Sequence, residues 1–217
     1  MKFETFLVVL VGWVFSLCLH EFSHALVAYF GGDTTVKEKG YLTFNPLKYT
    51  HPVFSILLPL LFLMLGGIGL PGGAVYIETW RLRSRGWVSA VSLAGPTANL
   101  LLAILLGLLF RFAPVTSGGV WPGLAFLAFL QVSAVVLNLI PLPPFDGFGA
   151  IEPYLPDNIR TAVAQTRGML PLVVFFLLWE VPAFYENFWA FVAFLAKSVG
   201  VPLPLVQLGF TLFRFWT

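Results

Sequence analysis

The stretch SLCLHEFSHALVAYF, residues 16–30, places three ionisable side chains inside a segment that is otherwise apolar. They are His20, Glu21 and His24, and they follow the uncharged run at residues 6–19. Ionisable groups are costly within a membrane span, and those that occur there usually pair with one another, bind a ligand or serve a function. Three of them within five residues therefore need a common explanation.

The composition indicates that this segment belongs to a membrane protein. Of the 217 residues, 59% are hydrophobic and only 10% are charged, and the mean hydropathy is +0.90; a soluble domain typically carries about a quarter charged residues. A membrane-spanning helix needs about 20 predominantly apolar residues. We therefore predict an all-α polytopic membrane protein, a single domain of residues 1–217 with about five to six membrane segments. The apolar runs on which this prediction rests are residues 6–19, 52–77, 86–110, 112–145, 168–179 and 198–213.

Three relatively polar stretches, residues 31–51, 76–85 and 147–167, contain most of the lysines and arginines. Cytoplasmic loops usually carry such an excess of positive charge, so we expect all three in the cytoplasm and the N-terminus outside. Residues 52–77, which include GGIGLPGG, must then leave and re-enter on one side, as a re-entrant segment. The pattern YLTF at residues 41–44, between a glycine and an Asn-Pro turn, predicts a short strand or β-hairpin.

Charge and cysteine content argue against two other features. The formal net charge is only +2, and no dense basic patch is present, so we expect no nucleic-acid partner. The single cysteine, Cys18, excludes an intramolecular disulfide.

The three ionisable residues form the pattern H-E-x-x-H. On a helix, residues four apart lie on one face, about 6 Å apart along the axis. The imidazoles of His20 and His24 can therefore bind one metal ion. The pattern is typical of zinc proteases, in which the intervening glutamate, here Glu21, serves as general base.

Two histidines do not complete a catalytic zinc site, which commonly has three protein ligands and one open position. His51, Glu180 and Asp146 are the candidates for the third. His51 lies in a polar loop, where a solvated histidine is the more common case, and Glu180 lies near the expected opposite interface. Asp146 follows the prolines of NLIPLPPF, which end the preceding span, and Gly147 allows a tight turn. That span is expected to run parallel to the first, so Asp146 can meet both histidines at one depth.

Four segments in a fixed order resemble the site-2 protease family of intramembrane zinc metalloproteases: HEFSH (20–24), GGDTTVKEKGYLTFNPLKYTHP (31–52), AGPTANLLLA (94–103) and NLIPLPPFDG (138–147). The resemblance covers a catalytic core at about residues 9–149, with further membrane segments at about residues 168–217. No stretch resembles a PDZ or CBS domain, so the resemblance implies a minimal member of the family.

The resemblance also implies roles for individual residues. Glu21 would be the catalytic base, and Asn138 would line the site, where it contacts substrate or stabilises the oxyanion. Asn99, in GPTAN, is expected either to face the site or to join two helices through a hydrogen bond. The implied ligands of a single zinc ion are His20, His24 and Asp146.

The implied activity is endopeptidase cleavage of single-span or otherwise membrane-anchored proteins within the lipid bilayer. A substrate helix must unwind, because its internal hydrogen bonds protect the peptide bonds. Residues 41–44 and 72–77 are the expected edges to which an unwound substrate would pair. For so compact a member of the family, the resemblance implies a prokaryotic cell membrane. The distribution of lysines and arginines predicts an active site near the cytoplasmic side.

Other classes of protein remain open at this point. A membrane zinc protease of the prenyl-protein type also carries H-E-x-x-H, but typically takes a glutamate as third ligand. A metal transporter would distribute polar residues over several spans at the midplane, and a catalytically silent zinc-binding relative would have no need of Glu21.

Overall fold

The computed structural model describes residues 1–49, 75–166 and 168–214. Within these ranges the regular secondary structure is helical throughout. The predicted re-entrant segment at residues 52–77 lies outside the described residues, except for its last three.

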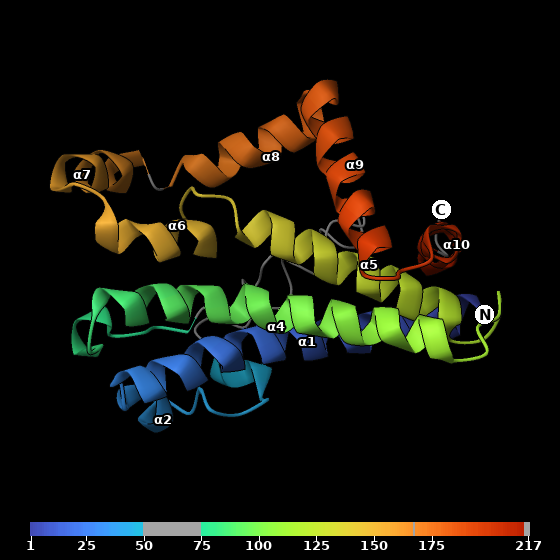
Figure 1. Cartoon of the computed structure of the whole chain (residues 1–217), viewed down its shortest axis with the longest axis horizontal. Helices are drawn as coiled ribbons and strands as arrows, with labels where there is room; N and C mark the ends of the chain where they lie inside the picture. Colours follow the sequence, from blue (N-terminus) through green and yellow to red (C-terminus); the bar gives the residue numbers. More distant parts are fainter. Residues whose placement is uncertain (50–74, 167, 215–217) are drawn as a thin grey trace.

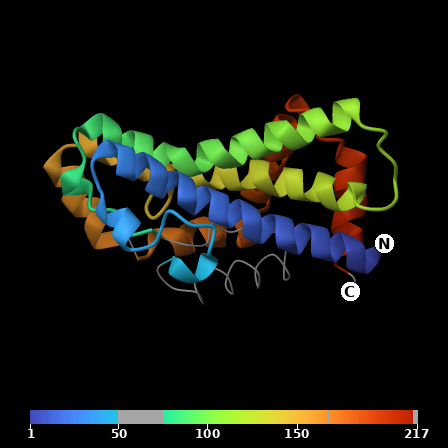
Figure 2. The same ribbon diagram turned by 90° about the horizontal axis from the view of Figure 1, so that it is seen from below.

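Three long helices lie side by side and form the bundle (Figure 1). They are α1 (Lys2–Gly31), α4 (Arg85–Phe112) and α5 (Trp121–Asn138). α1 and α5 run in the same direction and α4 runs in the opposite one, as both views show (Figures 1 and 2). The parallel orientation predicted for the first span and the span that leads to Asp146 is therefore confirmed.

All three helices are long and apolar enough to cross a membrane, so the chain is a membrane protein whose described residues form helices and no strands. Two shorter helices, α8 (Leu170–Glu180) and α9 (Pro182–Ser198), would together supply a fourth span, but a bend of 95° separates them. The described residues thus contain three or four candidate spans, and the predicted five to six are not confirmed. The bend falls at Pro182, which cannot donate a hydrogen bond to the preceding helix. A further predicted segment, residues 52–77, lies mostly outside the described residues.

The last helix, α10 (Leu203–Phe213), is apolar but too short to cross a bilayer alone. It packs against α5 and closes one side of a continuous apolar core. Trp13 of α1, Leu127 of α5 and Val192 of α9 are buried in the same core. Gly12 of α1 lies directly against Leu127. Small residues at such crossings let helix backbones approach closely within a membrane.

Short elements gather at one end of the bundle, where α1 and α5 end and α4 begins (Figure 1). The three predicted polar stretches therefore lie at the same end. The buried carboxylate of Asp33 joins two of them, since it accepts hydrogen bonds from the backbone N–H groups of Thr35 (3.1 Å) and Glu78 (2.8 Å). The short elements are α2 (Thr35–Glu38), η1 (Pro46–Lys48), η3 (Thr79–Arg81), α6 (Asp146–Ile151), η4 (Glu152–Tyr154) and α7 (Asp157–Thr166).

Ion pairs strengthen the connection at this polar end. Glu78 accepts hydrogen bonds from Arg81 Nε at 2.6 Å and from Lys39 Nζ at 2.9 Å. These two bonds lower the pKa of the Glu78 carboxyl. The segment that follows residue 74 is thereby tied to the loop that follows α1.

The strand or β-hairpin predicted at residues 41–44 does not form. The backbone N–H of Tyr41 donates back to the carbonyl of Val36 at 2.9 Å, so the chain turns locally. The ring of Phe44 stacks on that of Phe22 in α1, with centroids 4.8 Å apart. The apolar side chains that suggested a strand therefore pack on a helix surface, and these residues provide no strand edge for a substrate.

A prediction follows for the docking of α10 on α5. A Cβ atom at Gly209 would collide with the backbone carbonyl of Pro122, which no rotamer change can relieve. We expect Gly209→Ala to destabilise the protein by about 1–3 kcal/mol, the usual cost of overpacking. The measurement is thermal unfolding of the purified protein in detergent. Gly118→Ala is the control, since nothing lies within 4 Å of a Cβ there, and equal melting temperatures of the two variants would contradict the observed docking.

Candidate metal centre

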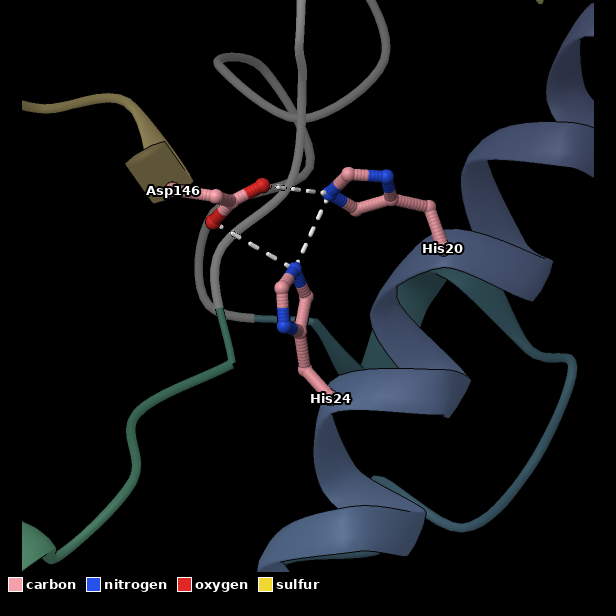
Figure 3. Close-up of side chains that lie close together, drawn as sticks. All are labelled: His20, His24 and Asp146. Carbon is pink, nitrogen blue, oxygen red and sulfur yellow. Dashed lines mark hydrogen bonds and ion pairs between the residues drawn. The ribbon is translucent and has the colours of Figure 1, made fainter. Parts of the chain in front are cut away.

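Three potential metal ligands converge at the polar end of the bundle. His20 and His24 lie one turn apart on the same face of α1 and are 8% and 6% exposed. Asp146 is the first residue of α6 and follows the proline-rich turn after α5. The three side chains point toward one another from two separate elements (Figure 3). One ligand atom from each lies within 4.8 Å of the other two.

The closest approach joins the two imidazoles. The Nε2 atoms of His20 and His24 are 3.0 Å apart. The Asp146 carboxylate faces both rings, with Oδ2 3.2 Å from His20 Nε2 and Oδ1 3.5 Å from His24 Nε2. These three groups surround a common point.

The outer nitrogens of the two rings show where the protons are. His24 Nδ1 lies 2.6 Å from the backbone carbonyl of Val91 in α4. A carbonyl oxygen only accepts, so His24 Nδ1 must be the protonated nitrogen. His20 Nδ1 lies 2.9 Å from Asn99 Oδ1 and donates to it. In neutral imidazoles both Nε2 atoms then carry lone pairs, which face each other.

A cation between the two Nε2 atoms would stabilise this arrangement. Two lone pairs at 3.0 Å repel unless positive charge lies between them. Among the described residues, Asp146 Oδ2 also has no hydrogen-bond donor in suitable geometry, although it is buried. Two imidazoles and one carboxylate are a donor set typical of catalytic zinc, so these residues fit that ion.

Gly95 of α4 provides the space for the two imidazoles. A Cβ atom built there would collide with the Nε2 atoms of both His20 and His24. Gly95 precedes Pro96 and lies one turn after Val91. Helix α4 therefore binds the His24 ring through the Val91 carbonyl and leaves space for both imidazoles at Gly95.

A cavity of about 330 Å³ adjoins the three ligands. Glu21 lines it, is only 4% exposed, and accepts a hydrogen bond at Oε2 from the backbone N–H of Val75 at 3.1 Å. Asn138, the last residue of α5, lines the same cavity and is 4% exposed. A buried carboxylate and a buried amide thus border the space next to the candidate metal ligands.

Three curated proteins are similar to the chain. It is 49% identical over 213 residues to a protein of Mycolicibacterium smegmatis named "Putative zinc metalloprotease Rip2", a match that covers 98% of this chain and 82% of that protein. The Mycobacterium tuberculosis protein with the same name is 46% identical, with the same coverage. YwhC of Bacillus subtilis, named in the same way, is 33% identical over 78% of each chain. The chain belongs to the site-2 protease family of zinc metalloproteases. No family model matches the chain, and no solved structure matches it significantly.

The structure of this site-2 protease brings together the predicted site residues. His20, Glu21, His24, Asn138 and Asp146 all border the same cavity. Of the two other candidates for the third ligand, Glu180 does not line this cavity. Glu180 is exposed at the end of α8, and His51 lies outside the described residues.

Both expectations for Asn99 are met. Its Oδ1 accepts from His20, so it faces the site, and its Nδ2 donates to Gln131 Oε1 at 3.1 Å, so it joins α4 to α5. The roles of the Val91 carbonyl and of Gln131 were missed by sequence reasoning. Nothing in the local sequence distinguishes either, since a backbone carbonyl has no sequence signature. For Gly95 a signal existed, because it lies within the AGPTAN segment that carries the family resemblance.

A substitution at Gly95 tests the geometry. We expect Gly95→Ala to lower bound zinc from about one ion per chain to a small fraction of that, because its Cβ displaces both imidazoles. Zinc is measured by inductively coupled plasma mass spectrometry after purification. Gly86→Ala is the control on the same helix, since its Cβ would make only an ordinary contact, 3.6 Å from Ser84 Oγ. Full zinc content in Gly95→Ala would contradict the arrangement of the two rings.

Proposed function

We propose that this protein is an intramembrane zinc endopeptidase that hydrolyses peptide bonds of membrane-anchored proteins, with Glu21 as general base. The observation that carries the proposal is the shared cavity. His20, His24 and Asp146 converge on one side of it, and Glu21 borders the same space. A binding site alone would not need a further buried carboxylate there.

His20, His24 and Asp146 are the proposed zinc ligands. Zinc in such a site is a Lewis acid that polarises a carbonyl oxygen and makes water more acidic. The Nδ1 bonds to Val91 and Asn99 would hold both imidazoles in orientation before the metal binds. Such outer contacts commonly fix the tautomer of a metal-binding histidine.

Glu21 is the proposed proton carrier. The Val75 N–H group holds Oε2, and we assign Oε1 to take a proton from the attacking water. Glu21 would then deliver this proton to the amine that leaves. Its position one residue after His20 places it on the same turn of α1 as a metal ligand.

Asn138 is the proposed donor to the oxyanion. It ends α5, eight residues before Asp146, and lines the cavity on that side. A preorganised amide donor aimed at developing negative charge stabilises the transition state more than the ground state. Asn138 is therefore assigned to orient the scissile carbonyl.

The proposed substrate is an unwound segment of a membrane-anchored protein. Three of the helices that carry or border the site are candidate membrane spans. An intact substrate helix would protect its peptide bonds. Val75 and Ile77 line the cavity beside Glu21 in a segment without regular secondary structure. Its backbone is the proposed partner for the unwound substrate, in the manner of β-augmentation.

The proposed site lies near the cytoplasmic side of a prokaryotic cell membrane. The lysines and arginines of the three polar stretches support this orientation, because such residues are enriched in cytoplasmic loops. The site adjoins these stretches, because Asp146 directly precedes residues 147–167 and Ile77 and Thr79 line the cavity. Water would therefore reach Glu21 from the cytoplasm without crossing the apolar core.

The first test separates catalysis from metal binding. We expect Glu21→Gln to lower the rate of cleavage by about 10²–10⁴-fold, the usual contribution of a general base, while zinc content stays at the wild-type value. Cleavage is measured on a panel of single-span substrates reconstituted with the purified enzyme. Glu186→Gln, an exposed carboxylate on α9, is the control and should keep full activity. Zinc binding without cleavage by the wild type would instead identify a silent zinc-binding relative.

The second test concerns the substrate class. One cleavable sequence is offered twice, as part of a single-span protein in liposomes and as a soluble peptide of the same residues. We expect cleavage of the anchored form to be at least about tenfold faster, because the bilayer holds the substrate at the depth of the site. Equal rates would reject the preference for anchored substrates, and faster cleavage of the free peptide would reverse it.

A further inference from the structure

The hydrogen bonds that begin at His20 continue through the bundle. Asn99 Nδ2 donates to Gln131 Oε1 at 3.1 Å, and Gln131 Nε2 donates to Ser16 Oγ at 3.0 Å. Ser16 Oγ donates to the backbone carbonyl of Trp13 at 2.8 Å. This chain of hydrogen bonds thus crosses from α1 to α4 and α5 and returns to α1 at Ser16, one helical turn before His20.

These polar side chains are almost inaccessible. Asn99, Gln131 and Ser16 are 4%, 0% and 2% exposed, and all three lie in candidate membrane spans. Polar groups at such positions are costly unless they are paired, and they commonly serve function. Gln131 is the central member, because both ends of its amide are used.

The carbonyl of Trp13 fixes which group donates and which accepts in each of these hydrogen bonds. Since this oxygen only accepts, the Ser16 hydroxyl donates to it and must accept from the NH₂ group of Gln131. The Gln131 oxygen then accepts from Asn99, and the Asn99 oxygen accepts from His20 Nδ1. With each group in this orientation, His20 carries its proton on Nδ1 and presents the Nε2 lone pair to the metal site.

The opposite direction would be incompatible with metal binding. Ser16 would donate to Gln131, Gln131 to Asn99 and Asn99 to His20 Nδ1, so a neutral ring would carry its proton on Nε2 and could not bind a cation there. On the Asn99 side of His20, the reversed series makes three hydrogen bonds, whereas the observed series makes four, because the bond from Ser16 to Trp13 is lost. In the reversed series the His20 Nε2 proton would point at His24 Nε2 and Asp146 Oδ2, which is where a metal ion would bind. A cation bound at Nε2 excludes a proton there, so the observed direction, which also keeps the bond from Ser16 to Trp13, is the one that metal binding requires.

We propose that Gln131 and Ser16 are positioning residues of the metal centre, which act through Asn99 to hold His20 in the tautomer that binds the ion. The proposal rests on the proposed zinc site. It assigns a role to two residues that are not metal ligands and do not line the cavity. It also means that α5, which leads to Asp146, controls a ligand on α1.

The experiment measures the affinity of the full-length protein for zinc, by competition with a chromogenic chelator in detergent. We expect Gln131→Leu to weaken zinc binding by about tenfold, at the lower end of the effect of contacts beyond the direct ligands. Ser16→Ala should weaken it by a smaller factor, because Gln131 keeps its bond to Asn99. The visible spectrum of the cobalt-substituted protein should change in both variants, since it reports the geometry of the ligands directly.

Ser133→Ala is the matched control. Ser133 is a buried serine, 2% exposed, whose hydroxyl donates to the carbonyl of Leu130 three residues earlier, as that of Ser16 does to Trp13. It differs only in having no part in the chain to His20. Its zinc affinity and cobalt spectrum should match the wild type.

Asn99→Asp distinguishes positioning from a merely structural link. An aspartate accepts the His20 proton in either orientation of its carboxylate, so it no longer depends on Gln131. In this background, Gln131→Leu should cause no further loss of zinc affinity, whereas independent effects would add. A loss of equal size in both backgrounds would overturn the proposal.

Thermal unfolding of the metal-free variants separates the remaining outcomes. If Gln131→Leu lowers the melting temperature but leaves zinc affinity within twofold of the wild type, the chain only joins the helices and the proposal is wrong. If the wild type itself binds no zinc, the proposed metal site fails instead. A tenfold loss of affinity together with a changed cobalt spectrum supports the positioning role.

Discussion

The approach of two imidazole nitrogens to 3.0 Å is the constraint on which the rest of this structure depends. Each ring donates its Nδ1 proton to an acceptor on α4. His24 donates to the carbonyl of Val91, and His20 donates to the side chain of Asn99. The facing lone pairs therefore require positive charge between them. The absence of a side chain at Gly95 and the carboxylate of Asp146 both serve that requirement, one by leaving space and the other by adding negative charge.

The bilayer explains why these groups lie where they do. Polar side chains within a span are costly unless they pair, and the candidate metal ligands form one connected set with the amides of Asn99 and Gln131. Beside it, the ends of α1 and α5 and the start of α4 bring three polar stretches together, and Asp33 joins two of these by hydrogen bonds. The segment containing Val75 is thereby held beside Glu21. The polar end of the bundle thus provides both the site and its access to water.

Sequence reasoning succeeded where chemistry is tied to spacing. The separation of His20 and His24 by four residues is enough to place both rings on one helix face, and the proline-rich turn before Asp146 indicated where the third ligand enters. Sequence reasoning was wrong where the same apolar residues could either form a strand or pack on a helix surface. Residues 41–44 have the composition of a strand, but Phe44 stacks on α1 instead. The predicted number of spans is not confirmed, because residues 52–77 lie mostly outside the described residues and a 95° bend at Pro182 separates α8 from α9.

By itself, the sequence determined the class of protein and identified two histidines and the adjacent glutamate as candidate site residues, because these depend on composition and on the repeat of a single helix. Only the tertiary structure decided which side chains from other helices form hydrogen bonds that lead to His20. Ser16, Asn99 and Gln131 are separated by up to 115 residues and become one hydrogen-bonded chain only when three helices pack. The position of a proton on His20 depends on donors and acceptors from all three helices, and no local pattern of residues contains that information.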